Sequence, residues 1–96
     1  MSFTQTHEVE GTLHQCLREL ISALGHRDFE MTGDEIIVRD QDKRLVISLT
    51  YEGDRRLGSL DLPMTSVAYT STGCTEAEAK EFHDHLAKHL MRVGGG

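Results

Sequence analysis

The chain has 96 residues, the size of a single domain, and its 38% hydrophobic and 27% charged content is ordinary for a globular protein. Its formal net charge of −6 speaks against nucleic acid and anionic membranes as partners, because binding phosphate requires a positive field. The two cysteines lack CxxC spacing, the N-terminus lacks a signal-peptide pattern, and no apolar run reaches the ~18–20 residues of a membrane span, so we expect a cytoplasmic protein.

The N-terminal quarter of the chain predicts a strand followed by a helix. Residues 2–10 alternate weakly and are rich in threonine, which favours a strand. Thr12 and Gln15 then fit a capping box, in which the threonine side chain caps a helix and the glutamine reaches back to the cap amide. Apolar residues follow at helical spacing as far as Gly25, which favours a helix end: Leu13, Cys16, Leu17, Leu20, Ile21 and Leu24.

The middle of the chain, residues 28–72, predicts four or five strands separated by polar turns. Residues 44–51 alternate cleanly between apolar and polar side chains, as expected for an antiparallel strand with one buried face. Residues 55–62 and 64–72 are interpreted as separate strands on either side of Pro63. This single proline has no amide donor, so we expect it at an edge, a kink or a bulge.

The last quarter predicts a second helix. Thr75 and Glu78 form another capping box, and residues 76–92 continue with apolar residues at helical spacing. Gly94–Gly96 is expected to end the helix as a flexible tail of one domain that spans residues 1–96.

Together, these elements predict a two-layer α+β sandwich. An antiparallel sheet of about five strands and two amphipathic helices bury their apolar sides if both helices pack on one face of the sheet. The order β-α-β(4–5)-α resembles the TATA-box-binding-protein-like fold in topology. The acidic composition speaks against extending this resemblance to DNA binding.

The residues with chemical potential each have a plainer structural interpretation, which we favour. His85 and His89 lie four apart on one helix face and could chelate a metal, but they also suit a solvated helix flank. Cys74 precedes a helix cap, where the dipole can stabilise a thiolate, but it can also pack as a small apolar residue. Without paired carboxylates, a Ser/His/Asp arrangement or a phosphate-binding glycine loop, the sequence predicts no catalytic residues, no cofactor and no metal.

The sheet face turned away from the helices is the predicted contact surface, because its small and hydroxylated side chains make it polar and flat. We interpret the chain as a non-catalytic accessory or regulatory module that binds another protein, or its own copy, through Ser48, Thr50, Ala68 and Thr70. The same face is expected to carry five further residues: Val46, Ser59, Asp61, Ser66 and Thr72.

Two other functions stay open. Gly94–Gly96 resembles the ends of ubiquitin-like and sulfur-carrier proteins, which implies a carrier activated at its terminal glycine. A small-ligand-binding domain, with a pocket between helices and sheet, is the other alternative.

Overall fold

The computed structural model describes residues 2–25 and 28–95, with side chains described as far as Leu90. Within these residues the elements follow in the order β1 (Ser2–Glu10), α1 (Leu13–Leu24), β2 (Phe29–Thr32), β3 (Glu35–Asp40), β4 (Lys43–Leu57), β5 (Leu60–Thr72) and α2 (Glu76–Gly95). The strands form one antiparallel sheet with the spatial order β1-β5-β4-β3-β2. The predicted α+β class, with a five-stranded antiparallel sheet and two helices, is confirmed.

Both helices begin with the capping boxes that the sequence predicts. The amide of Gln15 donates to the Thr12 hydroxyl at 3.2 Å, and the Thr12 amide donates to Gln15 Oε1 at 2.9 Å. At α2 the corresponding distances are 3.2 Å from the Glu78 amide to the Thr75 hydroxyl and 3.0 Å from the Thr75 amide to Glu78 Oε1. Each box satisfies amides that a helix start leaves without an internal partner, so both helix starts are set locally.

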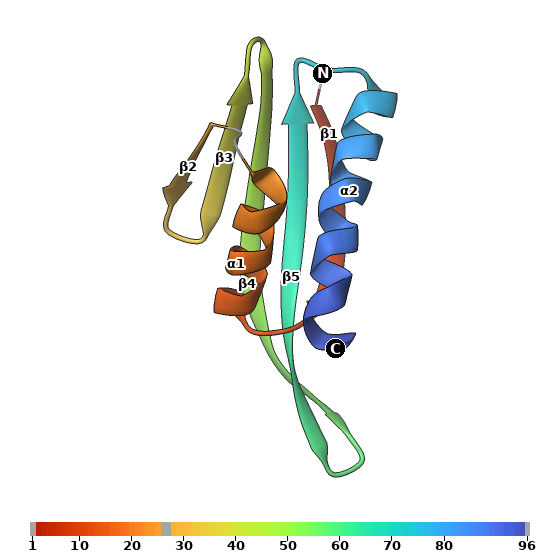
Figure 1. The fold of residues 1–96 in the computed structure, drawn as a ribbon. Coiled ribbons are helices and arrows are strands. Elements are labelled where there is room, and N and C mark those ends of the chain that lie inside the picture. The colour runs from red at the N-terminus through yellow and green to blue at the C-terminus, as the bar shows by residue number, and fades with distance from the viewer. Residues whose placement is uncertain (1, 26–27, 96) are drawn as a thin grey trace.

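The hydrophobic core lies between one sheet face and the two helices, which Figure 1 shows on the same side of the sheet. The inward residues of the strands alternate with half-buried or exposed neighbours, as a sheet with one covered face requires. Buried strand residues include Ile36, Val38, Leu45, Ile47, Leu49, Val67 and Tyr69, and buried helix residues include Cys16, Leu20, Leu24, Leu86 and Leu90.

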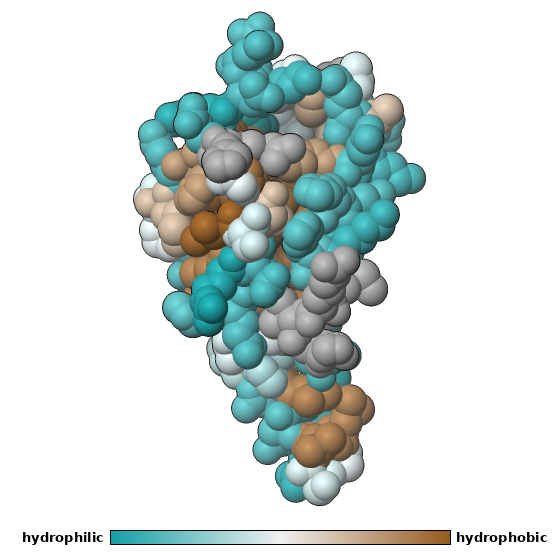
Figure 2. All heavy atoms as spheres, in the orientation of Figure 1, coloured by the Kyte–Doolittle hydropathy of each residue, from teal (hydrophilic) through white to brown (hydrophobic). Residues whose placement is uncertain are grey.

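β4 and β5 are much longer than their neighbours and extend past the body of the protein as a hairpin arm, formed by residues 52–63 (Figure 1). The arm begins at an irregularity in the register between Tyr51 and Gly53. Leu57 and Leu60 face each other at its tip and are 56% and 62% exposed. Figure 2 shows hydrophobic residues at this end of the molecule, although the rest of the arm is largely polar.

Pro63 lies inside β5, where the pairing between β1 and β5 ends. Its carbonyl accepts the Gly11 amide at 2.8 Å, but proline cannot donate in return. The Thr65 hydroxyl donates instead to the Gly11 carbonyl at 2.9 Å and replaces the missing ladder bond. β5 therefore continues through the proline without a break.

This continuity corrects two expected positions on the open face. Side chains of β5 alternate between the two sheet faces without interruption from Leu60 to Thr72. Leu60 and Leu62 therefore lie on the same face as Ala68, which is the open face. Asp61 therefore points to the opposite side of the strand, and Ser59 lies in the turn at the tip of the arm. The sequence interpretation was wrong here because it treated residues 55–62 as a strand of their own that ended at the proline, whereas β4 continues to Leu57 and the turn lies at Gly58 and Ser59.

The end of α2 also differs from the sequence expectation. The helix extends through Gly95, past its predicted end at residue 92, and Gly96 lies outside the described residues, so the flexible Gly94–Gly96 tail stays a prediction. Helix formation requires only backbone hydrogen bonds, and glycine opposes it by about 1 kcal/mol per residue relative to alanine.

Candidate functional site

The four predicted contact residues lie together on the sheet face that no described helix covers. Ser48 of β4 is directly opposite Ala68 of β5, and Thr50 and Thr70 belong to the adjacent cross-strand pairs on the same face. Both strands are central in the sheet, so the four residues form one contiguous area in its middle. Thr50 is exposed, whereas the other three are half-buried by their neighbours.

Hydrogen bonds and ion pairs organise this open face. The Ser48 hydroxyl donates to Glu35 Oε2 at 2.9 Å, and the hydroxyls of Thr4 and Thr70 are 3.2 Å apart. Two ion pairs lie toward its borders, one between Arg39 and Glu30 at 3.0 Å and one between Arg55 and Glu8 at 2.8 Å. The middle of the face therefore carries small, mostly polar side chains beside the apolar pair Ile37 and Val46, with charges of both signs toward its borders.

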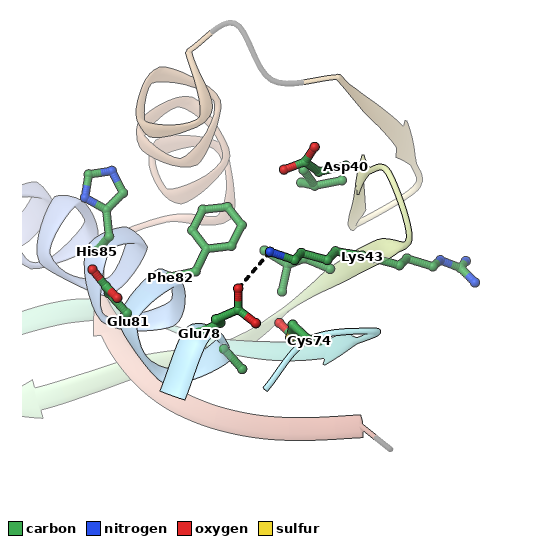
Figure 3. Close-up of a pocket in the computed structure, with 12 residues that line it drawn as sticks. Asp40, Lys43, Cys74, Glu78, Glu81, Phe82 and His85 are labelled. Atoms are coloured by element: carbon green, nitrogen blue, oxygen red, sulfur yellow. Dashed lines mark hydrogen bonds and ion pairs between the residues drawn. The ribbon is translucent and has the colours of Figure 1, made fainter. Parts of the chain in front are cut away.

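A cavity of about 430 Å³ lies on the other side of the sheet, between α2 and the ends of β3 and β4 (Figure 3). The Lys43 ammonium closes part of it by pairing with Glu78 Oε2 at 2.8 Å. The hydrogen bond from Lys43, with those from Thr75, lowers the pKa of Glu78 to about 2. Apolar and polar side chains share the lining, which includes Val38, Leu45, Ser71, Cys74, Phe82 and His85.

A buried polar network behind the cavity was missed by the sequence analysis. His83 is fully buried, with its Nδ1 at 2.6 Å from Gln5 Oε1 and its Nε2 at 2.7 Å from the Ser71 hydroxyl. Because the Gln5 oxygen can only accept, Nδ1 carries the proton and Nε2 accepts from Ser71. Burial lowers the pKa of His83 and keeps the ring neutral. The signal was present: His83 is four residues after Ala79 and three before Leu86, within the apolar stripe of α2.

The Ser71–His83–Gln5 arrangement superficially matches a nucleophile, a base and an orienting group. Its third member is an amide, which supplies no negative charge to stabilise a protonated imidazole. Ser71 is only 3% exposed, so a substrate has little access to its hydroxyl. The geometry fits a set of core polar groups that satisfy one another.

Tyr69 lies beside this network and is fully buried. Its ring stacks on His83 with centroids 5.3 Å apart and meets His7 edge-on at 6.0 Å. Its hydroxyl has no hydrogen-bond partner among the described residues. Burial raises the pKa of Tyr69, so the phenol stays protonated.

The sequence candidates for metal and thiol chemistry, the pair His85 and His89 and Cys74, lie within α2 and just before it. The rings of His85 and His89 approach each other with centroids 5.1 Å apart. No group of three or more potential metal ligands occurs among the described residues. Cys74 is half-buried in the cavity wall, whereas Cys16 is buried in the core, and that burial raises the pKa of the Cys16 thiol.

No protein-family model matches the chain, and no curated protein sequence does either. Over the described residues, neither helix combines the length and the apolar character needed to cross a membrane. The fold and its surfaces are therefore what indicates the function of this protein.

Proposed function

We propose that the chain is a non-catalytic accessory or regulatory module that binds another protein through the open face of its sheet. The observation that carries this proposal is the five-stranded face that no described helix covers, with Ser48, Thr50, Ala68 and Thr70 contiguous at its centre. The apolar stripes of both helices are already used in the core, so the helices offer no comparable surface. We also propose that the fold belongs to the TATA-box-binding-protein-like topology.

The chemistry of the open face favours a protein partner. Small side chains in the middle let another backbone or a flat surface approach closely, and paired charges of both signs suit a polar rim. The net charge of −6 opposes the phosphates of nucleic acid. A folded protein surface meets both conditions.

The direct experiment compares substitutions on the two sides of the molecule. Thr50→Arg places a long charged side chain on the open face, whereas Lys88→Arg keeps the charge at an exposed position of α2. Circular dichroism first checks that both variants are folded. Under native salt, the tagged wild-type chain and the tagged Lys88→Arg variant should both copurify the partner, whereas the tagged Thr50→Arg variant should not. Copurification of the same partner by Thr50→Arg would move the site away from this face.

A second candidate, small-ligand binding, is favoured by the cavity between α2 and the sheet. Its half-polar lining, with Phe82 beside Lys43 and Glu78, suits a small molecule that has both an apolar and a polar part. Native mass spectrometry of the freshly purified chain should then show a noncovalent added mass that Cys74→Phe, which fills the cavity, removes. A bare mass would count against this candidate, and a covalent mass on Gly96 would support the carrier alternative.

A further inference from the structure

The outer edge of the sheet at β1 has the properties of a pairing surface. β1 runs for nine residues beside β5 in a register without a bulge, whereas β2, at the opposite edge, has four residues. β1 contains no proline and no lysine, two of the features that proteins use to block edge pairing. Among the described residues, no strand pairs with its outer side.

The hydrogen bonds at the end of β1 show which backbone groups point outward. The Gly11 amide donates to the Pro63 carbonyl. Gly11 and Pro63 are the next opposing residues after the pair Glu10 and Met64, at which the pairing of β1 with β5 ends. In an antiparallel ladder, alternate residues bond to the same neighbouring strand. The odd-numbered residues of β1 therefore bond to β5, and the even-numbered ones present their amides and carbonyls to the outside: Ser2, Thr4, Thr6, Glu8 and Glu10.

We propose that β1 pairs with β1 of a second copy of this chain, antiparallel and across a two-fold axis at Thr6. Thr6 then lies opposite Thr6 of the second copy, and Thr4 lies opposite Glu8. Ser2 lies opposite Glu10 in the same register. The five hydrogen-bonded pairs exchange about ten backbone hydrogen bonds, two per pair, and use all the outward groups of β1. The product is one continuous sheet made of two five-stranded halves.

Charge and length select this register over the other symmetric ones. Axes at Gln5 and His7 would pair only residues 2–8 and 4–10, with four hydrogen-bonded pairs in place of five. An axis at Thr4 would pair residues 2–6 only, which is about half of the strand. An axis at Glu8 would be equally short and would place two glutamates directly opposite each other, which is destabilising. The axis at Thr6 uses the whole strand and sets each glutamate against a serine or a threonine.

The side chains on the helix face of β1 complement one another in the same register. Phe3 is half-buried and lies opposite Val9 of the second copy, so the pair extends the two cores toward each other. Gln5 lies opposite His7 of the second copy. Both are non-hydrogen-bonded pairs, in which opposing side chains approach most closely.

α2 packs over β1 and therefore also approaches the axis. One side of α2 lines the cavity, and by helical geometry the opposite side points outward beyond the edge of the sheet at β1. This outer flank carries Glu76, Lys80, Asp84 and Ala87. The flank thus presents charges of both signs and one small side chain toward the second copy.

The pairing is independent of the open sheet face, because it uses backbone groups at the edge rather than side chains in the centre. A cysteine crosslink tests its register. Opposing residues at the axis have Cα atoms about 5.5 Å apart, within the disulfide range of roughly 4.4–6.8 Å. The two copies of Thr4 would be separated by four residues along the strand, about 14 Å.

In a Cys74→Ser background under mild oxidation, Thr6→Cys should form a disulfide-linked dimer and Thr4→Cys should not. Equal crosslinking by the two variants would overturn the register. Sedimentation of the wild-type chain should show a monomer–dimer equilibrium that Thr6→Pro shifts to monomer. The Thr6 amide points outward, so this proline leaves the β1–β5 ladder intact.

Thr6→Val keeps the amide and should dimerise like the wild type. In amide exchange, Thr4, Thr6 and Glu8 should gain protection with increasing protein concentration. A wild-type chain that sediments as a monomer at millimolar concentration, with these amides unprotected, would overturn the proposed pairing. Because this test uses only the purified chain, its failure leaves the open-face proposal standing, and failure of the Thr50→Arg experiment leaves this one standing.

Discussion

Removing one oxygen atom from the core should stabilise this protein. The Tyr69 hydroxyl is buried and has no partner among the described residues. A buried polar group without a hydrogen bond costs about 1–3 kcal/mol relative to its hydrated state. Tyr69→Phe keeps the ring contacts with His83 and His7 and deletes only the hydroxyl. We therefore expect the free energy of unfolding to rise by about 1–3 kcal/mol, which corresponds to roughly 4–8 °C in Tm per kcal/mol for a domain of this size.

Urea unfolding followed by circular dichroism measures this change, and Tyr51→Phe is the matched control. Tyr51 is 49% exposed and its hydroxyl donates to the Asp54 carboxylate, so its removal should give no gain in stability. If Tyr69→Phe lowers the free energy of unfolding by about 1 kcal/mol or more, the hydroxyl has a partner in solution. The interpretation of the core around His83 would then be wrong.

Four further results follow from the core, the caps and the titrating groups, and urea unfolding measures each. Leu86→Ala should lower the free energy of unfolding by about 2–5 kcal/mol, because Leu86 is fully buried, and a neutral result would contradict its place in the core. Thr75→Ala should cost about 0.5–2 kcal/mol through the lost cap, and an unchanged midpoint would show that the cap contributes nothing. Because burial lowers the pKa of His83, the unfolded chain takes up the proton more readily. Stability should therefore fall as the pH drops below about 6.5, and a His83→Asn variant with the same slope would refute this. The hydrogen bonds from Lys43 and Thr75 lower the pKa of Glu78 from 4.5 to about 2, so the stability they supply is present above pH 4.5 and is lost toward pH 2. Glu78→Gln, which can keep the capping box, should reduce that acid-induced loss, and an unchanged acid profile would argue against the ion pair.

The sequence predicted the helices and the covered face of the sheet because their signals are local. Both capping boxes are complete within four residues, and the alternation around Ile47 indicates a face before any partner strand is known. The placement of Ser48 and Thr70 on the uncovered face follows from the same alternation. A period of two is enough to separate the faces when the strand is regular.

The parts that the sequence could not predict depend on contacts between distant residues. The Thr65 hydroxyl replaces the missing amide of Pro63 only because Gly11 lies beside it, so the proline gave a false strand boundary. The partners of His83 are Gln5, at the other end of the chain, and Ser71, on β5. The outward-pointing backbone groups of β1 could be identified only from the hydrogen bond between Gly11 and Pro63, which shows which residues of β1 bond to β5.

Alkylation of single introduced cysteines shows whether a protein partner contacts the open sheet face. Thr50→Cys and Lys88→Cys are prepared in a Cys74→Ser background, with Cys16 buried in the core. The rate of thiol alkylation is measured for each variant alone and in the copurified complex. We expect the partner to slow alkylation of Thr50→Cys strongly and to leave that of Lys88→Cys unchanged. Protection of Lys88→Cys with no protection of Thr50→Cys would place the partner on the helices and contradict it.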